Sequence, residues 1–162
     1  MLSRRSLYFA AAAFCAALII VALYMQEVMG LKPCYLCIVQ RVFVIVTGVL
    51  LLAAGWHNPG TVGQRIYGGL GALGALLGGG FSTRQLWLQS LPADQVPACG
   101  PPTEYLFDAL PWADALGLLL RGDGNCAEIQ WSLFGISIPG YTLMAFAGLA
   151  VFSLWQGWRR AG

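Results

Sequence analysis

Four long apolar segments, separated by polar ones, dominate the pattern along the chain. Each approaches the length of about 20 residues that an α-helix needs to cross a hydrocarbon core about 30 Å thick. The pattern predicts helices at about residues 7–26, 38–56, 66–83 and 139–158. The expected fold class is therefore an all-α membrane protein, a four-helix transmembrane bundle that forms a single domain over residues 1–162.

Local signals support these helices. The first apolar segment is longer than the core of a cleaved signal peptide, and no small-residue cleavage site follows it, so we expect it to be retained. The third is rich in glycine, and Gly71, Ala75 and Gly79 share one face at four-residue spacing, which suits close contact between helices in lipid. Pro139 stands at the start of the fourth, a favourable first helical position.

Residues 84–138 form the only long polar segment, and its prolines prevent a long helix. Between 103 and 120, large apolar side chains are interspersed with acids. This pattern predicts a short amphipathic helix in the membrane interface, broken at Pro111. The alternative is a partly ordered hydrophobic loop.

Composition strengthens the membrane assignment. Of the 162 residues, 58% are hydrophobic and 10% are charged, against about 45–50% and about 25% in soluble domains. The low net charge and abundant apolar side chains exclude a disordered chain. The scattered basic residues form no stripe that would track phosphates, so we expect no nucleic-acid partner.

The distribution of charge predicts an orientation. The ends of the chain and the turn at 57–65 carry arginines and no acids, whereas all seven acidic residues lie in the other polar segments. Because cytoplasmic loops are enriched in Arg and Lys, we expect residues 1–6, 57–65 and 159–162 to be cytoplasmic. The segments 27–37 and 84–138 would then face outward.

Four of the five cysteines lie in the outward segments. Cys34 and Cys37 form a Cys-x-x-Cys pair at the start of the second helix, where the helix N-terminus favours a thiolate. Such a pair also occurs in zinc sites and structural staples, so alone it is a weak signal. Cys15 lies within the first helix, where we expect a packing role.

Arg41 follows Cys37 by four residues and therefore lies on the same helix face, about 6 Å deeper. A charge inside a span is costly and points to function, although an arginine that snorkels to the interface is an alternative. Its position beside the thiol favours an activated thiolate that faces a cavity at membrane depth.

Cys99 and Cys126 bracket the amphipathic segment, and Cys99 lies in a Pro- and Gly-rich stretch. If they form a disulfide, two roles are open. The bond is either a structural staple or an exchange relay, since a thiolate can attack a neighbouring disulfide and pass oxidising equivalents on.

The whole chain resembles the disulfide bond formation protein B family, DsbB. The resemblance rests on residues 33–41, on Trp87-Leu88-Gln89 with Cys99 downstream, on residues 125–131, and on the layout of four spans. Members are bacterial inner-membrane enzymes that reoxidise the periplasmic thiol oxidase DsbA and reduce a quinone. The resemblance implies that function, a DsbA-like partner, a location in the bilayer of the inner membrane and a periplasmic face for the cysteines.

The resemblance also implies roles for individual residues. Cys99 would form the mixed disulfide with the partner, Cys126 would attack Cys34, and the Cys37 thiolate would pass electrons to a ubiquinone-type ring, with menaquinone as the alternative. Arg41 matches the family arginine that supports the thiolate and the quinone.

Many family members carry a histidine near the quinone where this chain has Gln85, which can still donate a hydrogen bond to a quinone carbonyl. The single histidine, His57, falls in the cytoplasmic turn, where we expect no catalytic role. The alternative to the enzyme is a small membrane scaffold or metal-binding protein whose cysteines are staples or ligands.

Overall fold

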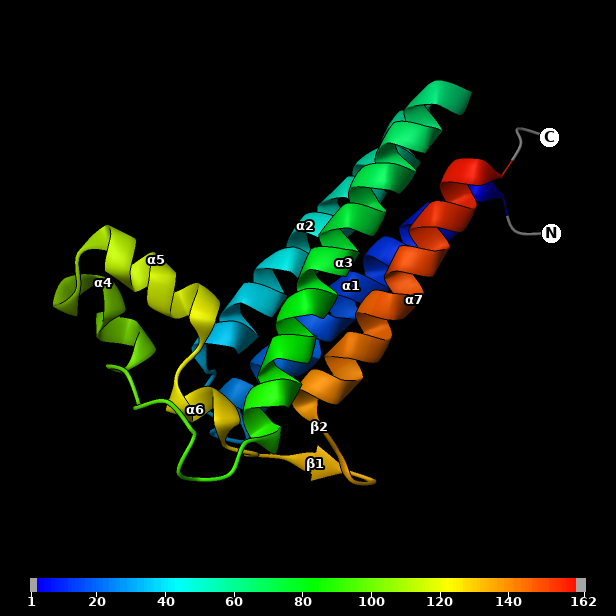
Figure 1. Ribbon diagram of the computed structural model, residues 1–162. Helices are drawn as coiled ribbons and strands as arrows, with labels where there is room; N and C mark the ends of the chain where they lie inside the picture. The colour runs from blue at the N-terminus through cyan, green and yellow to red at the C-terminus, as the bar shows by residue number, and fades with distance from the viewer. Residues whose placement is uncertain (1–2, 160–162) are drawn as a thin grey trace.

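A computed structural model describes residues 3–159 of the protein. Four long helices form a bundle, as Figure 1 shows: α1 (Arg4–Glu27), α2 (Tyr35–His57), α3 (Thr61–Ser90) and α7 (Ile138–Trp158). The all-α fold is confirmed. Within the described part of the chain, α1, α2 and α7 are long and apolar enough to cross a membrane.

Small residues on α3 let neighbouring helices of the bundle pack closely. α7 packs chiefly against α3, while α1 and α3 pack against α2. A Cβ added at Gly71 would lie 2.9 Å from Ser153 Oγ, and one at Gly78 would overlap the Phe146 ring. Gly71, Ala75 and Gly79 are all buried, as their shared face predicts. Glycine at these positions therefore lets α3 and α7 approach closely.

The helices extend beyond the predicted segments. α3 was expected at 66–83 but covers Thr61–Ser90, which leaves only residues 58–60 between α2 and α3 and places Gln85 in a helix rather than in a loop. Hydropathy marks only the apolar part of a helix, whereas this helix continues through polar turns whose inner face is buried. Residues 1–2 and 160–162, which belong to the segments predicted to be cytoplasmic and include Arg160, lie outside the described residues.

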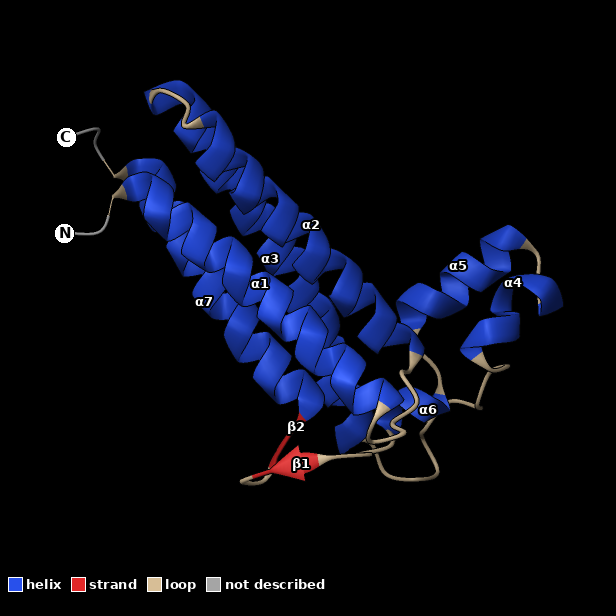
Figure 2. Ribbon diagram, turned by 180° about the vertical axis from the view of Figure 1, so that it is seen from behind, coloured by secondary structure: helices blue, strands red, loops and turns tan. Residues whose placement is uncertain are grey.

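The connection between α3 and α7 contains only short elements (Figures 1 and 2). Their bounds are η1 (Thr103–Tyr105), α4 (Leu106–Ala109), α5 (Trp112–Arg121), α6 (Gly124–Ala127), β1 (Ser132–Leu133) and β2 (Ile136–Ser137). The two strands form an antiparallel hairpin in which Ser132 pairs with Ser137. The chain is helical on both sides of Pro111, which caps α5, so the predicted break is confirmed.

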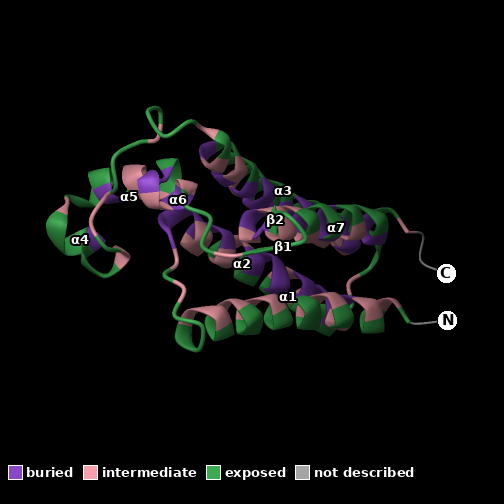
Figure 3. Ribbon diagram, turned by 90° about the horizontal axis from the view of Figure 1, so that it is seen from below, coloured by how far each residue is buried: buried purple, intermediate pink, exposed green. Residues whose placement is uncertain are grey.

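Two groups of buried apolar residues stabilise the fold. The first lies inside the bundle and includes Cys15, Leu51 and Phe146. The second lies where α2 and α3 meet α4, α5 and α6, and it contains Cys34 and Cys126. Figure 3 shows that much of α1 is exposed outside this packing, as expected for a helix that faces lipid. The second group holds the polar connection against the start of α2.

Candidate active site

The Cys-x-x-Cys pair lies at the first turn of α2. Cys34 is the N-cap residue, and its sulfur accepts a hydrogen bond from the Cys37 backbone N–H at 3.4 Å. The Sγ atoms of Cys34 and Cys37 lie 2.8 Å apart, so only a small adjustment separates them from the roughly 2.05 Å of a disulfide. The local helix start therefore prepares this pair for reversible bond formation.

Cys126, on the short helix α6, reaches the same cluster from the far end of the connection. Its side chain is fully buried. Cys34 lies in the same buried group as Cys126, and its neighbouring thiol is the main reason that the pKa of Cys126 lies below its ordinary value; burial opposes this, and the Leu36 and Asp123 backbones add to it. The two neighbouring cysteines and burial raise the pKa of Cys34. The arrangement favours a thiolate on Cys126 next to a protonated Cys34.

Cys99 is the exposed member of the set. Its loop lies against α6, because a Cβ added at Gly124 would be 3.0 Å from Cys99 Sγ. Asp123 Oδ2 accepts hydrogen bonds from the Gly100 backbone N–H at 2.7 Å and from Asn125 Nδ2 at 2.6 Å. The buried Asp123 carboxylate thus fastens the exposed cysteine beside the segment that carries Cys126.

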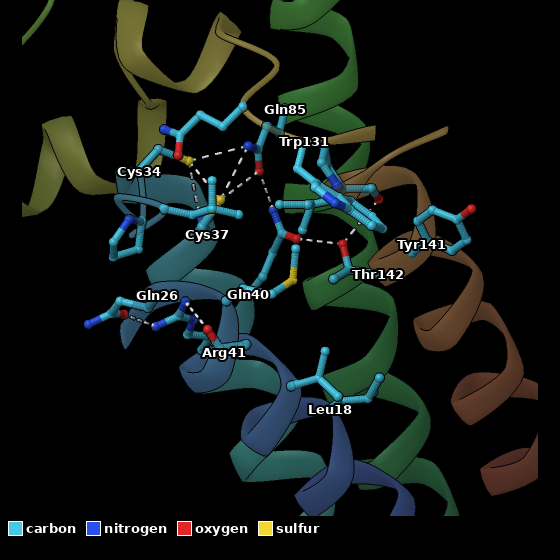
Figure 4. Close-up of a pocket in the computed structure, with 18 of the residues that line it drawn as sticks. Leu18, Gln26, Cys34, Cys37, Gln40, Arg41, Gln85, Trp131, Tyr141 and Thr142 are labelled. Atoms are coloured by element: carbon cyan, nitrogen blue, oxygen red, sulfur yellow. Dashed lines mark hydrogen bonds between the residues drawn. The ribbon is translucent and has the colours of Figure 1, made fainter. Parts of the chain in front are cut away.

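Gln85, on α3, contacts the sulfur atoms directly. Its Nε2 lies 3.2 Å from Cys34 Sγ and 3.3 Å from Cys37 Sγ, and its Oε1 accepts a hydrogen bond of 2.7 Å from Gln40 Nε2. Figure 4 shows the amide between the two cysteines and Gln40. The residue expected to face a cofactor is therefore also a hydrogen-bond donor to the thiol pair.

Arg41 is directed toward α1. Its Nη1 donates to Gln26 Oε1 at 2.6 Å and its Nη2 donates to the Ala22 carbonyl at 3.2 Å. Arg41 and Cys37 line the same cavity, which agrees with the shared face that their spacing predicts. The hydrogen bonds to α1 hold the guanidinium within the bundle, at the wall of this cavity.

The cavity has a volume of about 280 Å³ and lies between α1, α2 and α7. Its polar residues gather near the thiols, while Leu18, Met25 and Val44 give it apolar walls. Two aromatic rings, Trp131 and Tyr141, line the side nearest the hairpin, with centroids 6.1 Å apart (Figure 4). An amphipathic planar molecule matches such a lining, because it has both polar edges and apolar faces.

Along nearly its whole length the chain is similar to known proteins. A sequence model of the family described as disulfide bond formation protein DsbB matches residues 4–156. The chain belongs to the DsbB family. Among its relatives is the disulfide bond formation protein B of Saccharophagus degradans, 56% identical over 91% of this chain and 89% of that protein. The protein of the same name from Stutzerimonas stutzeri is 48% identical over 98% and 97% of the two chains, and disulfide bond formation protein B 1 of Pseudomonas aeruginosa is 45% identical over 98% of each.

As a DsbB family member, the chain is an inner-membrane disulfide oxidoreductase that reoxidises DsbA and depends on a quinone. This confirms the function that the resemblance implied. The family membership favours the enzyme over the alternative of a scaffold or metal-binding protein.

Two residues expected outside the DsbB site indeed lie elsewhere. Cys15 is buried on α1, and its Cβ would lie 2.9 Å from a Cβ added at Gly48. Cys15 therefore packs α1 against α2, as its position predicts. His57 lies at the last residue of α2, with its Nδ1 3.3 Å from the Tyr67 hydroxyl.

The structure also brings in three polar residues that sequence reasoning did not assign to the site: Gln40, Thr142 and Asp123. Gln40 stands in a span directly before Arg41, and an uncharged but strongly polar residue there is itself a signal. Thr142 gives little signal, because threonine is common in membrane helices. The role of Asp123 depends on a contact with Gly100 that only the folded connection creates.

Proposed function

We propose that electrons pass from a reduced DsbA-like partner to Cys99 and Cys126, then to Cys34 and Cys37, and finally to a membrane quinone. The observation that carries this order is the position of Cys34, whose sulfur lies 2.8 Å from Cys37 Sγ and whose side chain shares a buried group with Cys126. Exposed Cys99 stands at one end of the series, and Cys37, on the cavity wall, stands at the other.

The exchange begins with both pairs oxidised. A partner thiolate attacks Cys99, which forms a mixed disulfide and releases the Cys126 thiolate. Cys126 then attacks Cys34, so that a Cys34–Cys126 bond forms and Cys37 leaves as a thiolate. The partner's second thiol resolves the mixed disulfide, and the released Cys99 re-forms its bond with Cys126 and frees Cys34. The net result is an oxidised partner and a reduced Cys34–Cys37 pair.

The lowered pKa of Cys126 supports the second step, because the thiolate is the attacking species. The packing of Cys126 with Cys34 in one buried group supports Cys34, rather than Cys37, as the sulfur attacked. Attack on Cys34 leaves Cys37 as the free thiolate beside the cavity and the Gln85 amide.

The cavity fits a quinone head group by size and by chemistry. Arg41 and Gln85 are the residues that would hold it: the Arg41 guanidinium carries N–H donors suited to a ring carbonyl, and the Gln85 amide, whose N–H group faces the thiols, would border the ring beside them. The apolar walls suit an isoprenoid chain. A bound quinone supplies the capacity to accept two electrons and two protons. We propose a ubiquinone-type molecule, with menaquinone as the alternative.

We further propose that the cysteine end of the bundle is periplasmic and that both ends of the chain are cytoplasmic. The start of α1, the end of α7 and the turn between α2 and α3 share one end of the bundle, opposite α6 and the hairpin (Figure 1). The arginines of the segments that contain no acidic residue lie at the first of these ends: Arg4, Arg5, Arg65 and Arg159. Under the positive-inside rule, that end is the cytoplasmic one.

The experiment that tests the order uses a partner with a single active thiol, so that the mixed disulfide accumulates. Peptide mapping by mass spectrometry should find the partner on Cys99. Two variants form a matched pair. In Cys126→Ala with thionitrobenzoate attached to Cys99, the partner should displace the label and form a mixed disulfide with Cys99. In Cys99→Ala with thionitrobenzoate attached to Cys126, it should form no such bond. Adducts on Cys126 would contradict the proposed order.

The identity of the quinone is tested by turnover. Reduced DsbA-like protein drives reduction of short-chain ubiquinone and menaquinone analogues by the purified enzyme in lipid nanodiscs. We expect faster turnover with the ubiquinone analogue. Faster turnover with the menaquinone analogue would reject that choice while leaving the exchange order untouched.

A further inference from the structure

Three polar side chains from three helices form a hydrogen-bonded series that ends at the thiol pair. Thr142 Oγ1, on α7, has two acceptors for its single proton, of which Gln40 Oε1 at 2.7 Å is nearer than the Pro139 carbonyl at 3.0 Å. Gln40 Nε2, on α2, donates to Gln85 Oε1 at 2.7 Å. Gln85 Nε2, on α3, then donates to Cys34 and Cys37 at 3.2 and 3.3 Å. Figure 4 shows the series running from Thr142 to the sulfur atoms.

Burial makes these hydrogen bonds consequential. Gln40 and Gln85 are each 3% exposed, and an amide in such a place is costly unless its donor and acceptor ends both find partners. The Gln40 amide turns its oxygen toward α7 and its nitrogen toward Gln85, and the Gln85 nitrogen lies closer to Cys37 Sγ, at 3.3 Å, than the Gln85 oxygen, at 3.6 Å. The direction of the first hydrogen bond therefore propagates to the last.

The end of an amide that faces a sulfur atom determines what it stabilises. An N–H donor stabilises a thiolate, whereas a carbonyl oxygen stabilises a protonated thiol. An amide does not change its charge with pH in the physiological range. A correctly oriented Gln85 therefore supports the thiolate at every pH at which the enzyme works.

We propose that Thr142 and Gln40 are positioning residues that orient the Gln85 amide, so that its N–H group supports the thiolate of the Cys34–Cys37 pair. Gln85 touches the reacting sulfur atoms, while Thr142 and Gln40 act only through it. The proposal rests on the proposed function in one respect, that Cys37 is the thiolate released beside the cavity. It deepens that function by giving a position on α7 a role in thiol chemistry.

Thr142→Val removes the hydroxyl and nearly preserves the shape. Without the first donor, Gln40 and Gln85 can both reverse, which turns a carbonyl oxygen toward the sulfur atoms. We expect the rate of Cys37 alkylation by iodoacetamide at pH 7 to fall by roughly three- to tenfold, the range for loss of one hydrogen bond. Thr142→Ser, which retains the hydroxyl, should restore the rate, and Gln40→Met should lower it as Thr142→Val does.

Thr47 provides a matched control. It is also a buried threonine, on α2, but its hydroxyl has no hydrogen-bond partner among residues 3–159. Thr47→Val should leave the alkylation rate unchanged. Equal rates in Thr142→Val and the unmodified protein would overturn the proposal, and so would an equal fall in Thr47→Val, because that result would indicate general loosening of the bundle.

Equilibrium with dithiothreitol gives a second readout. Loss of thiolate support favours the disulfide, so Thr142→Val should increase the equilibrium constant for formation of the Cys34–Cys37 bond by a similar factor; a tenfold change corresponds to about 30 mV. An unchanged constant would count against the proposal. Neither measurement uses the partner or the quinone, so a negative result would not contradict the proposed exchange order. In the same way, a negative result in the peptide-mapping experiment would not contradict the proposed role of Thr142 and Gln40.

Discussion

Replacement of Asp123 by alanine should weaken the Cys99–Cys126 disulfide. The Asp123 carboxylate is 1% exposed and accepts two hydrogen bonds, one of which, from the Gly100 N–H at 2.7 Å, holds the Cys99 loop against α6. A hydrogen bond to a charged group contributes about 1.5–3 kcal/mol. A free-energy change of about 1.4 kcal/mol corresponds to a factor of ten in an equilibrium constant. Loss of this hydrogen bond should therefore lower the equilibrium constant for docking of the Cys99 loop by roughly tenfold to hundredfold.

We expect the lower end of this range. A second contact, from the Gly124 N–H to the Ala98 carbonyl at 3.4 Å, still holds the loop when Asp123 is removed. The free energy that remains keeps part of the loop docked, and the equilibrium constant for disulfide formation should fall by about tenfold. Asp123→Asn retains an acceptor without the charge and should give a smaller effect, because a neutral hydrogen bond contributes about 0.5–1.5 kcal/mol.

The assay is redox equilibrium with glutathione in a background of Cys34→Ser and Cys37→Ser, which isolates the outer pair. The oxidised fraction is read by gel shift after thiol labelling. Asp94→Ala is the matched control, since it removes an exposed acid from the same connection. A constant within twofold of the reference for Asp123→Ala, or an equal fall for Asp94→Ala, would refute the reasoning.

Three further predictions follow from the site and the bundle. Arg41→Ala should lower turnover with a quinone analogue by at least tenfold while leaving thiol exchange with the partner intact, measured by stopped-flow fluorescence; unchanged quinone kinetics would remove Arg41 from the mechanism. The midpoint of the pH profile for Cys126 alkylation should lie below the ordinary value for a cysteine thiol and rise in Cys34→Ala, because the neighbouring thiol that lowers the pKa of Cys126 is lost; a midpoint that stays or falls would contradict this effect of Cys34. Gly78→Ala should destabilise the bundle by about 1–3 kcal/mol in detergent unfolding, since its methyl group meets an aromatic ring of α7. Gly80→Ala, with open space around it, should cost nothing, and equal losses for the two would disprove close packing of α3 on α7.

The helix ends show how far local patterns reach. The apolar segments predicted the four long helices, and three of these, α1, α2 and α7, have the length and apolar character that a membrane-spanning helix needs. The same pattern placed the end of α3 at 83, although the helix continues to Ser90. Its last turns are polar in sequence but bury Gln85 and Leu88 against other elements, a fact that hydropathy does not register.

The sequence by itself determined the class of the protein, the break at Pro111, the Cys-x-x-Cys pair at a helix start and the coincidence of Arg41 with the Cys37 face. Each of these depends on residues within about two helical turns of one another. Only the tertiary structure decided which thiols lie together: Cys34 and Cys126 share a buried group because α6 packs on α2 and α3. It also placed Gln85 beside Gln40 of α2, which in turn is hydrogen-bonded to Thr142 of α7. These contacts join segments far apart in the chain, so they arise from packing and leave no periodicity or spacing in the sequence.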